Sequence, residues 1–372
     1  MASDIFLAGA ASRTITPPLA ERPVWLAGAQ RERQATAVHS PLQVRALAMR
    51  HGERVVILLS CDLIGLHLSD IEEIRSALSK HNIAADAVVL TCTGTLRGPD
   101  TLGFWGDDGP NAIDSVYLAT IKRAIEEAAI EALTFGCPVR MRSANTVVPG
   151  LPDVAVSAIQ FERPSGEILA TLMNLDYPPR TVGSQISSDY VGVACQAVEQ
   201  AVGGLALHVT GAQGVRLAEA AAPSDADAEA LGRAYADAVV AALRDRELES
   251  IERFESSQQS VWLPISKRAL LQAHAAGQLR QRQLRDVGFV TSFTVMRLGS
   301  AQLLAVPGVP TAGLAAILRE AMSGDVRMLL SNANDSLGPL LRIGEEPTSS
   351  WPLSPGDDAG PRLMFAVRKA LE

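Results

Sequence analysis

The sequence lacks the features that mark nucleic-acid-binding, membrane-spanning and secreted proteins. Its 33 Lys and Arg are outnumbered by 41 Asp and Glu, the net charge is −8, and no basic cluster is present to neutralise phosphates. No apolar run approaches the ~20 residues that a membrane helix needs. The first ten residues lack the basic charges and continuous apolar core of a signal peptide. We therefore expect no nucleic-acid partner, no transmembrane segment and a cytoplasmic location.

Cysteine and histidine are also scarce. The 4 cysteines lie far apart without CxxC spacing, which is typical of buried thiols in a reduced compartment. The 6 histidines show no metal-ligand spacing. What the sequence does have is 47% hydrophobic and 20% charged residues over a length of 372. Such a composition is typical of a globular protein with an ample core.

One order of elements recurs three times along the chain: a hairpin of two strands, a loop, a helix and a further strand. Ser69 with Glu72 has capping-box spacing, and Pro310 suits a first helical turn. We expect an α/β fold with mixed sheets, flanking helices and three similar units in a single domain over residues 1–372. The units cover residues 44–49, 55–61, 69–80 and 87–91; 156–161, 168–174, 188–202 and 205–210; and 293–298, 302–306, 310–322 and 326–331. The segments 112–133, 225–243, 266–286 and 361–371 are expected to be helical or partly helical connectors.

The three units place six loops in equivalent positions, after the second hairpin strand or after the last strand. Ligands bind beyond strand ends in mixed and parallel sheets, so these loops are the expected place for a site. The six loops are 62–65, 93–100, 176–183, 211–216, 307–310 and 332–338.

Short motifs from residue 10 to about residue 340 resemble, in order, those of the neutral/alkaline non-lysosomal ceramidases. The resemblance implies the fold of their catalytic-type domain, without the C-terminal immunoglobulin-like domain of the large members. It also suggests zinc-dependent hydrolysis of an N-acyl amide bond. The matching motifs are Ala10-Ala11-Ser12-Arg13-Thr14-Ile15-Thr16-Pro17-Pro18, Val38-His39-Ser40-Pro41-Leu42, Arg45-Ala46-Leu47, Ser60-Cys61-Asp62-Leu63-Ile64-Gly65-Leu66, Gly98-Pro99-Asp100-Thr101, Ser187-Ser188-Asp189-Tyr190, Gly211-Ala212-Gln213-Gly214, Val306-Pro307-Gly308 with Pro310, and Ala333-Asn334-Asp335 with Leu337-Gly338.

The positions that hold zinc in the family carry other residues in this sequence. Gly94 stands where the first zinc histidine is expected, and Pro178 falls near the second. Val309 replaces the glutamate, Ser336 replaces the tyrosine, and Leu217 replaces a serine of the family's loop. Zinc needs three or four converging His, Cys or carboxylate ligands. The resemblance therefore predicts a divergent member without the metal site and without a cofactor.

Two arginines in the candidate loops are the strongest alternative binding groups. Arg97 replaces a small serine with a planar guanidinium suited to a carboxylate or phosphate, and Arg216 lies in an equivalent loop. The alternative is that both arginines make structural ion pairs with Asp100, Asp176, Asp189 or Asp335 and fill the space of the zinc and its water. The candidate binding residues are Arg97, Arg216, Asp62, Asp100, Asp176, Asp189, Asn334, Asp335 and Ser336.

Two further side chains are candidates for chemistry. Cys92 ends an apolar strand beside the loop and is a possible nucleophile with His39 as its base, although a buried cysteine at a strand end is typically a small hydrophobe. Tyr177 with Asp176 suits acid–base work beside Arg97, or forms a stiff loop with the prolines that follow. In the retained motifs, Asp62, Asp189 and Asn334 have residue types suited to holding loop geometry.

Three functional hypotheses follow. In the first, the protein is non-catalytic and binds a small-molecule ligand, or it pairs with an intact ceramidase-like paralogue in a homo- or hetero-oligomer. In the second, it is a metal-independent hydrolase or acyltransferase acting on an amide or ester of a small anionic substrate held by Arg97 and Arg216. The third is a zinc amide hydrolase with a shifted site, which metal analysis would reveal.

Overall fold

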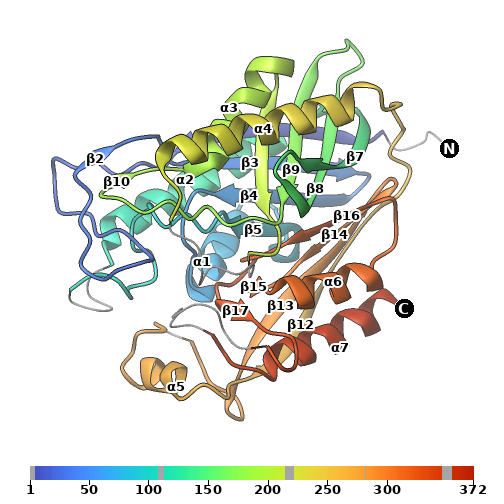
Figure 1. Ribbon diagram of the computed structural model, residues 1–372. Coiled ribbons are helices and arrows are strands. Elements are labelled where there is room, and N and C mark those ends of the chain that lie inside the picture. The colour runs from blue at the N-terminus through green and yellow to red at the C-terminus, as the bar shows by residue number, and fades with distance from the viewer. Residues whose placement is uncertain (1–4, 108–112, 214–221, 281, 346–353) are drawn as a thin grey trace.

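The computed structural model describes residues 5–107, 113–213, 222–280, 282–345 and 354–372 (Figure 1). Within these ranges the chain repeats one arrangement three times: a strand, a hairpin of two strands, a helix, a fourth strand and a closing helix. The predicted hairpin, helix and strand of each unit are confirmed. The sequence did not show the strand that precedes each hairpin, and it treated the closing helices as connectors.

The first unit forms a five-stranded sheet in the order β5-β4-β3-β1-β6. The strands β1, β3 and β4 are antiparallel, whereas β5 is parallel to β4 because helix α1 carries the chain back to the other end of the sheet. Its elements are β1 (Leu7–Thr14), β3 (Gln43–His51), β4 (Arg54–Cys61), α1 (Leu68–Ser79), β5 (Val88–Cys92), α2 (Ser115–Thr134) and β6 (Cys137–Pro138).

The second and third units build four-stranded sheets with the same connectivity, in the orders β11-β9-β8-β7 and β12-β13-β14-β16. The fourth strand is again parallel to the second hairpin strand in each. The second unit consists of β7 (Arg140–Val148), β8 (Leu151–Glu162), β9 (Ile168–Leu175), α3 (Asp189–Val202), β11 (Leu205–Thr210) and α4 (Asp225–Arg244). The third consists of β12 (Phe254–Pro264), β13 (Gly288–Leu298), β14 (Ala301–Ala305), α6 (Ala312–Ala321), β16 (Val326–Leu330) and α7 (Ala359–Leu371).

Short elements link the loops between the units. Strand β2 (Ala37–Val38) pairs in parallel with β10 (Gln185–Ile186), and β15 (Val309–Pro310) pairs in parallel with β17 (Pro339–Leu340). Helix α5 (Arg268–Ala275) lies in the segment expected to be a partly helical connector, and a 3-10 turn (Ala85–Ala87) precedes β5.

Two predicted helix starts are shifted. Helix α1 begins at Leu68, so Ser69 lies inside its first turn and makes no cap, and the buried Ser69 hydroxyl has no partner among the described residues. Helix α6 follows the N-cap Thr311, whose hydroxyl accepts from Leu314 N, and Pro310 belongs to β15. In both cases the loop that precedes the helix is fixed by contacts with distant segments, which local capping rules do not include.

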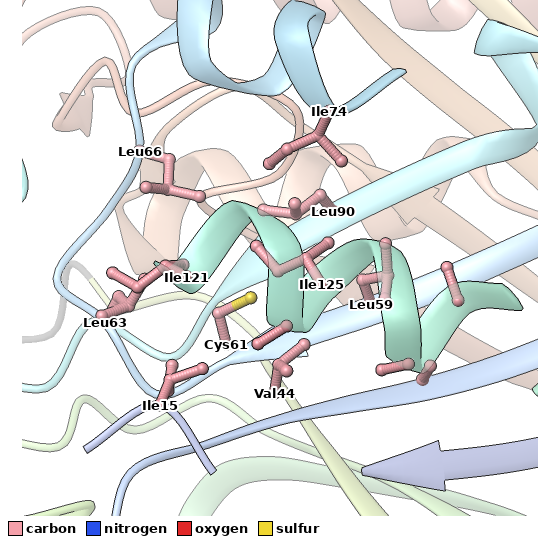
Figure 2. Close-up of a cluster of buried hydrophobic side chains, with 14 of the residues drawn as sticks. Ile15, Val44, Leu59, Cys61, Leu63, Leu66, Ile74, Leu90, Ile121 and Ile125 are labelled. Atoms are coloured by element: carbon pink, nitrogen blue, oxygen red, sulfur yellow. The ribbon is translucent and has the colours of Figure 1, made fainter. Parts of the chain in front are cut away.

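The central strands of each sheet are buried on both faces. Along β4 the side chains alternate: Ile57 and Leu59 pack under helices α1 and α2, whereas Val56 and Leu58 face a central core. Figure 2 shows the helix-covered face, where Ile121 of α2 lies beside Leu63 and Ile125 lies near Cys61 and Leu90. Burial on both faces explains why these strands read as continuous apolar runs.

The central core joins the three units. It contains Leu58 of the first sheet, Phe161 and Leu207 of the second, and Leu303 and Met328 of the third. Each unit adds an outer core between its sheet and its own helices, with α3 and α4 over the second sheet and α6 and α7 over the third. In the described residues, no helix is long and apolar enough to cross a membrane.

Candidate functional site

The ends of the parallel strands meet where the three units join. Ser331, just after β16, donates its backbone N–H to Thr210 O of β11 at 2.9 Å, and the Thr210 hydroxyl donates to Thr93 O, just after β5, at 3.0 Å. Cys92 N donates to Asn332 O at 3.2 Å. Loops from all three units, which the sequence predicts as the place for a site, therefore come together at this junction.

Gly94 lies at the junction in a conformation that favours glycine, with φ of +85°. A Cβ added to Gly94 would lie 2.7 Å from Nε2 and 2.9 Å from Oε1 of Gln213. Gln213 is 7% exposed, and its Nε2 donates to Thr93 O at 2.9 Å. An amide side chain thus fills the space beside Gly94.

Arg97 is buried and ion-paired. Its side chain is 2% exposed, its Nε donates to Gln185 O at 2.7 Å, and its Nη1 pairs with Asp225, the first residue of α4. None of the four aspartates predicted as partners takes this role, because α4 places Asp225 against the loop. The neighbouring Arg33 has a lowered pKa, mainly from burial and secondarily from the charge of Arg97. Arg216, the second predicted arginine, lies outside the described residues.

Asp100 is fully engaged by its own loop. Its Oδ1 accepts from the N–H groups of Leu102 and Gly103 at 3.1 and 2.7 Å, and its Oδ2 accepts from those of Trp105 and Gly106 at 2.7 and 3.1 Å. Four backbone donors leave little capacity for a ligand. The contacts of Asp100 are those of a residue that shapes the glycine-rich loop.

Asp62 and Asp176 begin equivalent loops, and an arginine contacts each of them. Asp62 accepts from Gln43 N at 2.9 Å and from Arg45 Nη1 at 3.4 Å. Burial raises the pKa of Asp62, and Arg45 opposes this shift. Asp176 receives both Nη groups of Arg319, from α6, at 2.5 and 2.6 Å.

Asp189 has a loop-stabilising environment at the start of α3. Its Oδ2 accepts from Thr181 N at 2.8 Å and also from the Thr181 hydroxyl at 2.5 Å, and its Oδ1 accepts from Tyr190 N at 2.6 Å. Asp189 has a φ of +59°, in the left-handed region. These contacts fix the end of the 176–183 loop.

The motif from Asn334 to Ser336 ties the third unit to the first. Asn334 Oδ1 accepts from Leu90 N at 3.1 Å, and Ser336 Oγ accepts from Leu66 N at 3.0 Å. Asp335 pairs with Arg282 and accepts from the Thr291 hydroxyl at 2.8 Å. Each polar side chain of this motif has a protein partner, and a ligand-binding role for it stays a prediction.

The surroundings of Cys92 and His39 do not favour their prediction as a nucleophile and its base. The Cys92 thiol is 1% exposed, and burial, followed by the charge of Asp62, raises its pKa far above the ordinary range. A raised pKa disfavours the thiolate. His39 is exposed and lies 4.0 Å from Asp225. The environment of Cys92 is that of a buried small hydrophobe.

Tyr177 lines a pocket of about 340 Å³ beside the 176–183 loop. The pocket wall includes Pro178 and Tyr190 and the first half of helix α4. Arg180 Nε donates to the Tyr177 hydroxyl at 3.2 Å, and Arg180 Cζ lies 5.8 Å from the centre of the Tyr177 ring. Two predicted candidate residues, Tyr177 and Asp189, line this pocket.

Solved structures of ceramidases have a similar fold. A neutral ceramidase from Pseudomonas aeruginosa superimposes with a TM-score of 0.75 at 16% identity, covering 99% of this chain and 73% of the other. A ceramidase complexed with C2 gives a TM-score of 0.76 at 14% identity, covering 99% and 74%. The chain has the neutral ceramidase fold. No family model matches the sequence, and no curated protein does.

The residues that the sequence resemblance assigns to zinc positions do not fit a zinc ion. Gly94 and Val309 offer no side-chain ligand, and neither does Pro178. Ser336 Oγ is bonded to Leu66 N, and a Cβ on Gly65 would lie 2.5 Å from it. Within the ranges that the structure describes, no three His, Cys, Asp or Glu side chains form a group able to hold a metal. Leu217, the remaining inherited position, lies outside these ranges.

Sequence reasoning missed several residues that shape this region. The sequence held a signal for Gln213, because this large amide stands in a motif that is otherwise rich in glycine and alanine. Arg319 had none, since it lies on a helix 143 positions from Asp176 and is brought to it only by the packing of two units. Arg180 was visible in a candidate loop, but only the tertiary structure shows that no described carboxylate pairs with it.

Proposed function

We propose that this chain is a ceramidase-fold protein that works without the inherited zinc site and binds a small ligand. The observation that carries the proposal is the packing of Gln213 against Gly94. In the zinc-dependent reading, a histidine would occupy that space, but here an amide donates to Thr93 O at 2.9 Å. When a fold is retained but a protein side chain fills the position of a metal ligand, a binding role is favoured over hydrolysis. Service as the partner of an intact ceramidase-like subunit is a second form of the same non-catalytic role.

A metal-independent hydrolase that holds its substrate with Arg97 is less well supported. Arg97 is 2% exposed and already pairs with Asp225. A substrate carboxylate would have to displace Asp225 before it reached the guanidinium. Cys92 is poorly suited as a nucleophile, because it is buried and burial raises the pKa of its thiol.

Metal content and amide hydrolysis together test the proposal. Untagged protein is incubated with zinc, passed over a chelating resin and assayed by inductively coupled plasma mass spectrometry. We expect far less than one zinc per chain, and no hydrolysis of a short N-acyl amide with or without added zinc. If one zinc per chain remains after the resin and turnover depends on zinc, the zinc amide hydrolase hypothesis would be supported instead.

A Gly94→His variant is the matched control. It returns one inherited ligand but leaves Pro178, Val309 and Ser336, so it should not gain stoichiometric zinc. Turnover without metal that disappears in Arg97→Ala would instead support the hydrolase.

A further inference from the structure

Arg180 differs from Arg97 because, among the described residues, no carboxylate neutralises it. Within the part of the chain that the structure describes, no carboxylate oxygen lies within 4.0 Å of its guanidinium, whereas Arg97 and Arg319 are both paired. Arg180 uses Nε for the Tyr177 hydroxyl, at 3.2 Å, and its two Nη groups have no partner among the described residues. A guanidinium carries five N–H donors, so most of its capacity is available to a ligand.

Two aspartates line the same pocket, and protein donors hold both oxygens of Asp189 and Oδ2 of Asp227. Asp189 accepts from Thr181 and from Tyr190 N. Asp227 belongs to the capping box of α4, where its Oδ2 accepts from the Ser224 N–H at 2.9 Å and from the Ser224 hydroxyl at 2.8 Å. Neither carboxylate lies within 4.0 Å of the Arg180 guanidinium, so its charge is available to a ligand.

The loop that carries Arg180 is held at both ends. Asp176 is fixed by Arg319 and by Ala212 N, and Thr181 is fixed by Asp189. Pro178 and Pro179 stiffen the segment between these anchors. Arg180 is therefore positioned before any ligand arrives, which lowers the entropy cost of binding.

The remainder of the pocket is largely apolar. Its walls include Leu151, Pro178, Leu231 and Ala234, with the ring of Tyr190. The volume of about 340 Å³ lies near the lower end of the roughly 300–1,000 Å³ found for small-molecule pockets. Such a pocket suits a compact apolar body and not a long chain.

We propose that this pocket binds a monocarboxylate attached to an apolar body about the size of a substituted benzene ring. The ligand carboxylate accepts from the Nη groups of Arg180. It also accepts from the Tyr177 hydroxyl, whose proton is free because that oxygen accepts from Arg180 Nε. The inference rests on the proposed function, since it names the ligand class of a non-catalytic binding protein.

Isothermal titration calorimetry with three matched probes tests the assignment. Phenylacetate carries the carboxylate, 2-phenylacetamide is its neutral match, and phenethylamine is its cationic match. We expect saturable binding of phenylacetate alone. Losing a charge-assisted hydrogen bond should weaken this binding on the order of 10- to 100-fold in Arg180→Gln.

Two further variants separate the pocket from general damage. Arg233→Gln removes an arginine of α4 that is 64% exposed and does not line the pocket. This variant should bind phenylacetate like the parent protein. Ala230→Phe fills the pocket from an exposed wall position and should abolish binding with Arg180 intact.

The assignment is overturned if the parent protein binds no probe, if it binds the amide as tightly as the acid, or if Arg180→Gln keeps the parent affinity. The zinc content of the same samples is measured independently. If the protein is free of zinc and does not bind phenylacetate, only this pocket assignment is wrong. If the protein keeps one zinc per chain after the resin and shows zinc-dependent turnover, the proposed function itself is wrong.

Discussion

At the residue scale, the glycine at position 94 and the packed side chain of Gln213 depend on each other. The φ of +85° at position 94 favours glycine, and the amide of Gln213 would meet any Cβ placed there at 2.7 Å. Returning a histidine to position 94 therefore requires Gln213 to move and to give up its hydrogen bond to Thr93 O. The two positions form one packed unit, and a single substitution cannot rebuild a metal site there.

Arg97 shows what a residue type predicts and what it does not. The sequence left two roles open for Arg97, ligand binding and a structural ion pair. The buried guanidinium has a carboxylate partner in the structure. The partner is Asp225, which lies 128 positions along the chain. Nothing local to either residue indicates this pairing, because it depends on where α4 begins relative to the first unit.

His208 should make the protein less stable in acid. Burial, followed by the charge of Arg45, lowers the pKa of His208 to about 3. The unfolded value is about 6.5, so between these two values the unfolded state binds more protons. Stability is thus fully present above about pH 6.5 and is lost as the pH falls toward 3. The ceiling of this loss is roughly 5 kcal/mol at 1.36 kcal/mol per pKa unit.

Urea unfolding of the parent and of His208→Gln, between about pH 4.5 and 7.5, checks this expectation. The difference between the two proteins isolates His208 from other groups, such as Asp62, whose raised pKa acts in the opposite direction. The parent should lose stability faster than the variant as the pH falls. Parallel curves would show that His208 is not buried in its neutral form.

At the scale of elements, the loops after β4 and β9 share one device. Each begins with an aspartate, Asp62 or Asp176, held by an arginine from another element. The third unit has Val306 directly after β14, so it lacks the charged anchor. The repeat therefore persists in backbone topology, while its polar contacts have diverged.

The Asp176–Arg319 pair should be a strong link between the second and third units. Its side chains are only 11% and 18% exposed, so Asp176→Ala leaves a partly buried guanidinium without its partner. We expect a loss of about 3 kcal/mol in unfolding free energy. The double variant with Arg319→Ala should lose less than the sum of the two single losses.

Glu229→Ala provides the comparison for this pair. Glu229 pairs with Arg233 on the exposed surface of α4, where the side chains are 57% and 64% exposed. Such a pair contributes about 0.5 kcal/mol. Additive losses at positions 176 and 319, or a loss no larger than that of Glu229→Ala, would contradict a coupled interunit link.

At the scale of the whole molecule, the three sheets share a single central core. Leu58, Phe161 and Leu303 each come from a different sheet and belong to the same buried cluster. The helices cover the outer faces, as the pairs α3 with α4 and α6 with α7 show (Figure 1). Because no sheet buries its inner face alone, the units should fold together.

Phe161→Ala tests this cooperation. Phe161 is 0% exposed in the central core, so its truncation should cost about 3–5 kcal/mol. Hydrogen exchange measured by mass spectrometry should show equal losses of protection in β4, β9 and β14. Phe135→Ala, at a side chain that is 70% exposed, should change little. Destabilisation confined to the second sheet would mean that the units are energetically independent.

The sequence by itself determined the hairpin, helix and final strand of each unit, the likeness to the ceramidase fold and the lack of zinc ligands at Gly94, Pro178 and Val309. The hairpins, helices and strands follow from apolar periodicity, which is a local property. The likeness and the zinc positions follow from the resemblance of short motifs to those of the ceramidases. It missed the first strands of the second and third units because β7 and the middle of β12 are largely polar or half-exposed. Only the tertiary structure decided that Asp225 pairs with Arg97, that Gln213 fills the space beside Gly94 and that Arg180 has no carboxylate partner among the described residues. Each of these depends on contacts between distant segments, whose geometry is set by packing three sheets around one core.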